Sequence, residues 1–254
     1  MPAVSALWSG KGWEPAQPGN LRGDYLAAYL GDMRVALSEI FQRNYFITSR
    51  MGQALNSRVQ GILPLVAVFM ARTGNRIIRI QEVVIEPEGK ATFAPIGSKA
   101  SNARVQGVFV EFIHPSKTEP QQLYYFGTDL SNAGMQQKPE LAAFIRQFPD
   151  KITLIKSASY LLHTAPFSQI RQLILEESEA CLQDDTGVPY QYFQEGSWQV
   201  QLYGKYARPI RDFNHGYQPA LAQRFAQDQG VKPIDFTFGY HWWTDNSSII
   251  LAQK

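Results

Sequence analysis

Four side chains in the second half of the chain have the types needed for acid–base chemistry. Asp184 and Asp185 are adjacent carboxylates in the sequence QDDTGVPY, and such a pair can bind a cation or act as acid and base. Lys156 and His163 lie on or just after a nominally buried strand, and α/β sheets place ligands at carboxyl strand ends. One hypothesis is therefore a hydrolase- or transferase-like enzyme at these four residues. The other interpretation is a polar turn after a helix, because Asp and Gly are common turn residues.

The triplet Asp185-Thr186-Gly187 also matches the catalytic triplet of aspartic proteases, in which two carboxylates share one proton. A single-chain enzyme of that kind needs a second triplet, and neither residues 129–131 nor residues 235–237 supply one. Those enzymes also have an apolar strand before the aspartate, whereas the spacing here predicts a helix. We therefore do not expect an aspartic protease.

Other catalytic and cofactor-binding motifs are missing from the sequence. The four histidines have no second ligand at helical spacing, and the single Cys181 can form neither an internal disulfide nor a cysteine-based zinc site. The chain has no phosphate-binding loop, no G-x-G-x-x-G and no G-x-S-x-G, which argues against nucleotide-dependent and ordinary serine-hydrolase classes. We expect no metal and no cofactor, and we expect Cys181 to be a small core residue in a helix.

Residues 40–81 carry the strongest charge anomaly in a chain of net charge +2, with six arginines, no lysine and no acid. The planar donor fork of arginine suits carboxylate, phosphate or sulfate, so this region is a candidate surface for an anionic ligand. Ordinary surface pairs with acids such as Glu82 and Glu86 are the alternative. Nucleic acid is not expected, because aromatic residues are not interleaved with the arginines. The candidate binding residues are Arg43, Arg50, Arg58, Arg72, Arg76 and Arg79.

The first 23 residues predict an extended arm, because they hold three prolines and four glycines without an apolar period. Trp8 and Trp13 would be poorly placed in water, so the arm is expected to lie across its own domain or a partner. The N-terminus lacks the basic and apolar regions of a secretory signal, and a signal peptide already removed is the alternative. The longest apolar run, 61–71, is shorter than the ~20 residues of a membrane-spanning helix and predicts a buried strand or short core helix.

Apolar periodicity predicts a mixed α/β to α+β fold. We expect helices over 24–41, from Pro139, through Ile170 to Cys181, and from Pro219. The expected strands are 76–86, a hairpin of 107–114 and 121–127, a buried strand over 152–162, and closing strands over 198–206, 235–243 and 248–252. Together these elements predict a single mixed layered domain over 24–254, with an antiparallel C-terminal portion, after the arm of residues 1–23.

Several sequence blocks resemble a recurrent pattern in uncharacterised exported bacterial proteins. Over about residues 120–252 these blocks are LYYFGTDLSNAG, KSASYLLH, FSQIRQLILEES, QDDTGVPYQYF, YGKYARPI and FTFGYHWW. In the first half the similarity is confined to residues 85–89. The resemblance implies a bacterial, extracytoplasmic location, periplasmic or secreted, and it implies no particular activity.

Our leading hypothesis is a non-enzymatic extracytoplasmic binding or assembly subunit. Its tryptophan-bearing arm and arginine-rich region would contact a protein partner or a second copy of the chain. The enzyme at Asp184, Asp185 and His163 is the alternative. The enzyme requires these side chains to converge in one pocket with perturbed pKa values, whereas the assembly protein requires the arm and the arginines to be exposed in the absence of a partner.

Overall fold

The computed structural model describes residues 63–95, 105–156, 158–208, 210–240 and 247–254, together with Ala27 and Gly31. The predicted arm, with Trp8 and Trp13, lies outside the described residues, as do Arg43, Arg50, Arg58 and nearly all of the helix predicted over 24–41. Contacts divide the chain into two compact units, and in the described ranges the first holds residues up to 128 and 138–145 and the second holds the rest. The prediction of one domain over 24–254 stays a prediction.

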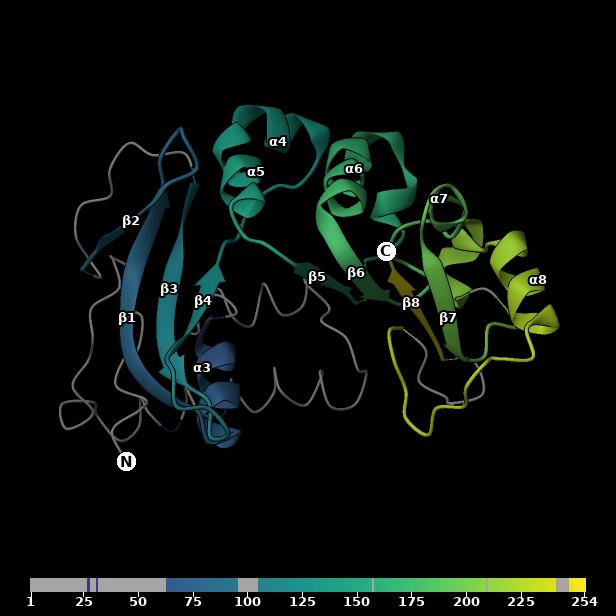
Figure 1. The fold of residues 1–254 in the computed structure, drawn as a ribbon, viewed down its shortest axis with the longest axis horizontal. Coiled ribbons are helices and arrows are strands. Elements are labelled where there is room, and N and C mark those ends of the chain that lie inside the picture. The colour runs from purple at the N-terminus through teal and green to yellow at the C-terminus, as the bar shows by residue number, and fades with distance from the viewer. Residues whose placement is uncertain are drawn as a thin grey trace. The chain divides into compact units, whose positions relative to one another are not determined.

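The first unit contains an antiparallel sheet in the order β2-β1-β3-β4 (Figure 1). Its elements are α3 (Leu63–Arg72), β1 (Arg76–Ile85), β2 (Ala91–Ala94), β3 (Val105–Ile113), β4 (Gln121–Tyr125) and all but the last residue of α5 (Pro139–Arg146). The described part of the apolar run, residues 63–71, therefore forms a helix, and the strand predicted over 76–86 is confirmed. The hairpin prediction is also confirmed, because β3 pairs with β4 in antiparallel register.

Aromatic side chains fill one face of this first sheet. The buried ring of Phe109 on β3 lies 4.7 Å from Phe93 and 5.1 Å from Tyr124, measured between ring centroids. Tyr124 in turn contacts Phe144 of α5 at 5.2 Å. The helix from Pro139 thus covers the sheet with the apolar face that its periodicity predicts.

The second unit contains a mixed sheet in the order β5-β6-β8-β7 (Figure 1). Its strands are β5 (Lys151–Ile155), β6 (Ser178–Gln183), β7 (Gln199–Gly204) and β8 (Ser248–Gln253), and its α-helices are α4 (Asn132–Gln137), α6 (Ser168–Glu177), α7 (Gln191–Gln194) and α8 (Pro219–Gln227). β5 and β6 are parallel and are connected through α6, whereas β8 is antiparallel to both β6 and β7. The mixed α+β fold with an antiparallel C-terminal portion is therefore confirmed.

The core of the second unit lies between its sheet and α8. Leu202 of β7 and Ile250 of β8 are fully buried and are paired in the sheet register. They form one cluster with Tyr190, Tyr206 and Leu221 of α8. This core supports the loop that follows β6, because Tyr190, a member of the core cluster, is the last residue of that loop.

Two predicted elements of the second unit were wrong. The strand predicted over 152–162 ends at Ile155 and is not buried, because one face of β5 is uncovered and leaves Ile152 76% and Leu154 64% exposed. Cys181 lies in β6 rather than in a helix, because α6 ends at Glu177 and β6 begins at the next residue, Ser178. The turn with Asp184 therefore follows a strand, which removes the preceding-helix argument against an aspartic protease but leaves the missing second triplet.

The closing region is confirmed in part. β7 and β8 match the strands predicted over 198–206 and 248–252, whereas residues 235–240 do not form a strand and 241–243 lie outside the described residues. In the ranges that the structure describes, no helix is both long enough and apolar enough to cross a membrane.

Candidate functional site

Four fully buried polar residues lie in one segment, Gln183–Tyr190, which we call the aspartate loop. All eight of its residues are buried. The Gln183 side chain closes the loop, since its amide nitrogen donates to the Val188 carbonyl at 2.7 Å and its amide oxygen accepts from the Val188 N–H at 2.8 Å. Position 187 has no room for a side chain, because a Cβ there would stand 2.5 Å from the Gln183 amide oxygen, and glycine has none. A composition typical of a surface turn thus forms an interior loop.

Asp184 caps the backbone of the aspartate loop. Its carboxylate accepts from the Thr186 N–H at 3.0 Å and from the Thr186 hydroxyl at 2.5 Å, and the hydroxyl oxygen accepts from the Ala158 N–H at 2.7 Å. A Cβ on Gly239, where φ is +72°, would overlap the Asp184 carboxylate. Asp184 therefore joins three separate segments of the second unit.

Lys156 lies beside Asp184 because β5 and β6 are parallel neighbours, with Ile155 opposite Gln183. The residues that follow the two strands therefore meet at one edge of the sheet. Burial lowers the pKa of Lys156, and the negative charge of Asp184 opposes part of that shift. The ammonium also stands 5.9 Å from the centre of the Phe238 ring.

Asp185 is held by groups from two other segments. The Tyr160 hydroxyl donates to the Asp185 carboxylate, and the Gln218 amide donates to the Asp185 carbonyl at 2.8 Å. The Gln218 N–H donates to the Tyr206 hydroxyl at 2.9 Å. Burial and the charge of Asp185 raise the pKa of Tyr160 and of Tyr206, so both phenols keep their protons at neutral pH.

The segment that carries Tyr160 has a strained backbone. Ser159 and Tyr160 have φ angles of 54° and 57°, in the left-handed region that residues other than glycine rarely adopt. The strain is offset by contacts on the Tyr160 ring, which packs 5.8 Å from Phe213 and against Gly216, where a Cβ would come within 2.5 Å. The Ser159 hydroxyl also forms a hydrogen bond with the Tyr240 hydroxyl. Strain of this kind is common at functional sites.

His163 completes the cluster. Its ring lies 5.0 Å from Tyr160 in an edge-on contact, and its Nε2 atom is buried with no hydrogen-bond partner in the described part of the chain. Burial lowers the pKa of His163 to about 4, although the charge of Asp185 acts in the opposite direction. The imidazole is therefore neutral at neutral pH.

This neutral histidine predicts a pH dependence of stability. An unfolded histidine titrates near ~6.5, so between about pH 6.5 and pH 4 the unfolded chain binds the extra proton. The stabilising effect is complete above about pH 6.5 and is lost as the pH falls toward 4. Urea unfolding from pH 4 to pH 8 should show a shallower pH dependence for His163→Gln than for the wild type. The exposed His114 provides the control variant His114→Gln, which should follow the wild type, and equal curves for all three proteins would contradict the prediction.

The four predicted residues thus lie around one buried cluster, but their chemical roles stay predictions. Asp184 and Asp185 are fully buried, whereas acid–base catalysis needs the carboxylates within reach of a substrate. Among the described residues no group of three or more His, Cys, Asp or Glu side chains could hold a metal ion. Burial raises the pKa of Cys181 to about 12, so its thiol stays protonated.

Sequence reasoning missed Tyr160 and Gln218, which hold Asp185, and it considered Thr186 only as part of the protease triplet. The tyrosine stands three residues before His163 in the block KSASYLLH, and this spacing was the available signal for it. Gln218 had no local signal, because its contact with Asp185 spans 33 residues of sequence.

The described arginines of the candidate binding region lie in the first unit. Arg72 ends α3, and Arg76 and Arg79 lie on β1, all three exposed. Arg79 pairs with Glu111 at 3.1 Å and stands 5.3 Å from the centre of the Phe109 ring. The alternative of ordinary surface pairing therefore applies to Arg79.

The described part of the chain defines a mixed α+β protein with two four-stranded sheets and a polar cluster around the buried Asp184 and Asp185 in its second unit. No family model, no curated protein and no solved structure matches this chain. The resemblance to uncharacterised exported bacterial proteins stays a prediction.

Proposed function

We propose that this chain is a non-enzymatic, extracytoplasmic bacterial binding or assembly subunit. The observation that supports it is the pair of exposed apolar side chains, Ile152 and Leu154, on one face of the outer strand β5. Two neighbouring large apolar side chains exposed on one sheet face are a feature of surfaces that meet another molecule. The arm with Trp8 and Trp13 and the arginines at 43–79 are part of the proposal as further contacts with the partner.

Deleting residues 1–22 tests the contribution of the arm. We expect the full chain to form assemblies larger than a monomer in light scattering, and we expect the deletion to weaken them. Arg72→Ala combined with Arg76→Ala should have a smaller effect in the same direction, since both side chains are exposed. A full chain that stays monomeric at all concentrations, with an unchanged profile after the deletion, contradicts assembly through the arm.

The enzyme alternative is favoured by one observation, the strained Ser159–Tyr160 segment next to the unpaired Nε2 of His163. Modification by diethylpyrocarbonate, read by mass spectrometry, distinguishes the two functions. In a sealed structural cluster His163 is protected while the exposed His114 reacts. Modification of His163 as fast as His114 would favour an open catalytic site instead.

A further inference from the structure

A short surface segment, residues 158–164, contacts the aspartate loop, and we call it the tyrosine strap. It lies between β5 and α6 in the sequence and contains the 3-10 helix η2 (Leu161–His163). The His163 N–H donates to the Tyr160 carbonyl at 3.0 Å, which holds the segment in a compact turn. Leu161 is 47% exposed, so one side of the turn faces solvent. The strap can therefore move outward as one piece without passing through the core.

Hydrogen bonds to side chains attach the strap to the aspartate loop. The Tyr160 hydroxyl donates to the Asp185 carboxylate, and the Ala158 N–H donates to the Thr186 hydroxyl at 2.7 Å. Neither bond belongs to the backbone pairing of β6 with β5 or with β8. The strap can therefore separate from the aspartate loop without breaking the sheet.

The backbone of the strap favours release. Ser159 and Tyr160 both have left-handed φ angles, which are unfavourable for residues other than glycine. When the strap separates from the loop, both residues can return to ordinary φ angles. The strain thus offsets part of the stabilisation that the tertiary contacts supply, and opening of the strap relieves it.

His163 makes the position of the strap depend on pH. Its Nε2 atom is buried without a hydrogen-bond partner in the described part of the chain, and burial lowers the pKa of the ring to about 4. An opened strap returns the imidazole to water, where it titrates near ~6.5. Between these two pH values the open form binds the extra proton, so a falling pH favours opening.

The groups that face His163 come from the strap itself, from α6 and from the aspartate loop. The Tyr160 ring contacts it edge-on and keeps its own proton. The charge of Asp185 favours the protonated imidazole, whereas the charge of Arg171 opposes it. The Arg171 guanidinium also donates to a strap carbonyl at 2.6 Å. A proton on His163 therefore places a like charge beside the arginine that tethers the strap.

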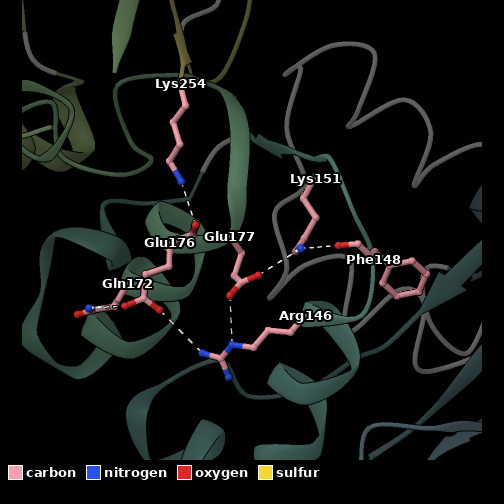
Figure 2. A network of polar contacts seen from close by, with 7 residues as sticks. All are labelled: Arg146, Phe148, Lys151, Gln172, Glu176, Glu177 and Lys254. Atoms are coloured by element: carbon pink, nitrogen blue, oxygen red, sulfur yellow. Dashed lines mark hydrogen bonds and ion pairs between the residues drawn. The ribbon is translucent and has the colours of Figure 1, made fainter. Parts of the chain in front are cut away.

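The elements on either side of the strap are fixed to each other by a network of ion pairs (Figure 2). Glu177, at the end of α6, binds the Lys151 ammonium of β5 at 3.2 Å and the Arg146 guanidinium at 3.2 Å. Lys254 donates to the Glu176 carbonyl at 2.9 Å. Hydrogen bonds from Lys151 and then from Arg146 lower the pKa of Glu177, so the network keeps its charge in mildly acidic solution. The strap can therefore open while β5 and α6 stay in place.

We propose that the tyrosine strap is an acid-sensitive cover, which releases the aspartate loop in mildly acidic solution while the rest of the second unit stays folded. The open form exposes the Asp185 carboxylate and the Tyr160 hydroxyl, both of which are buried in the closed form. Mild acid then makes available a polar surface that the protein hides at neutral pH. This inference goes beyond the assembly function and does not depend on it.

Hydrogen–deuterium exchange tests the proposal through the Ala158 amide, because its bond to Thr186 breaks when the strap opens. With a His163 pKa of about 4 in the closed form and ~6.5 in the open form, the opening constant should rise about 20-fold from pH 7 to pH 5. The exchange rates are corrected for the intrinsic effect of pH. Low urea should leave the Ala158 exchange unchanged, whereas the amides of β8 should exchange only through global unfolding.

Two variants separate the histidine from the tyrosine. His163→Gln removes the titrating ring and should abolish the pH dependence of opening. The exposed His215, whose ring lies 6.3 Å from Tyr160, provides the matched control His215→Gln, which should keep that dependence. Tyr160→Phe removes the bond to Asp185 and should raise the opening constant about 30-fold at every pH without changing the pH dependence.

Two results would overturn the proposal. If the Ala158 amide shows the same opening constant and urea dependence as β8 in the wild type, the strap opens only with the whole unit. This comparison needs no variant, so it holds even if His163→Gln does not fold. A pH dependence that persists in a folded His163→Gln would also overturn the proposal. Neither result bears on the assembly function, which light scattering of the arm deletion tests.

Discussion

Gly204→Ala is expected to lower the free energy of unfolding of the second unit by about 3 to 5 kcal/mol. Gly204 ends β7 with a φ of +80°, and an added Cβ would overlap the Ser247 carbonyl oxygen and stand 2.9 Å from the Ile234 side chain. That carbonyl accepts from the Lys205 N–H at 2.8 Å, so it cannot move without breaking a backbone hydrogen bond. Urea denaturation followed by circular dichroism measures the loss.

Gly196→Ala is the matched control for this substitution. Gly196 also has a positive φ, of +105°, but its nearest neighbour would be the Trp198 ring at 4.0 Å. Only the backbone strain then remains, and we expect a loss of about 1 to 2 kcal/mol. Equal losses for the two variants would show that the overlap with Ser247 is relieved by a small backbone shift.

Tyr160→Phe is expected to destabilise the protein by about 2 to 3 kcal/mol, because it removes a hydrogen bond donated to a buried carboxylate. The ring stays and keeps its contacts with His163 and Phe213, so the variant isolates the bond to Asp185. The measurement is again the free energy of unfolding in urea.

Tyr192→Phe serves as the control for Tyr160→Phe. Tyr192 is half-buried, and its ring lies 4.6 Å from the Arg171 guanidinium, a contact that phenylalanine keeps. A loss below about 0.5 kcal/mol is expected there. If Tyr160→Phe cost no more than this control, the Tyr160 hydroxyl would not be needed to hold Asp185, and the cluster would depend on its other contacts.

Local sequence patterns predicted most of the helices and strands whose type and buried face can be recognised from their own residues. β1 is rich in β-branched residues and stops before Pro87, and α5 begins at Pro139 with an apolar face, so both could be predicted. β5 could not be predicted correctly, because its apolar residues resemble those of a buried strand. Its exposure depends on whether other elements cover the face that carries Ile152 and Leu154, which the strand's own sequence does not reveal.

The candidate site could likewise be predicted from the sequence only in part. The proximity of Lys156 to Asp184 could be predicted, because residues after parallel neighbouring strands meet at one sheet edge. The burial of the aspartate loop could not be, since its composition is that of an exposed turn. Tyr160 and Gln218, which bury it, lie 25 and 33 residues from Asp185, and no local pattern carries contacts of that range.

The direct passage from α6 to β6 has a consequence for how this sequence can change during evolution. A helix advances by about 100° per residue, whereas each strand residue alternates between two sides, so the junction at Glu177 and Ser178 couples two incompatible periods. One inserted residue would turn the buried Cys181 to the opposite side of the sheet. Homologous chains should therefore exchange amino acids at this junction but keep its length constant, and insertions should gather in the turns between other elements.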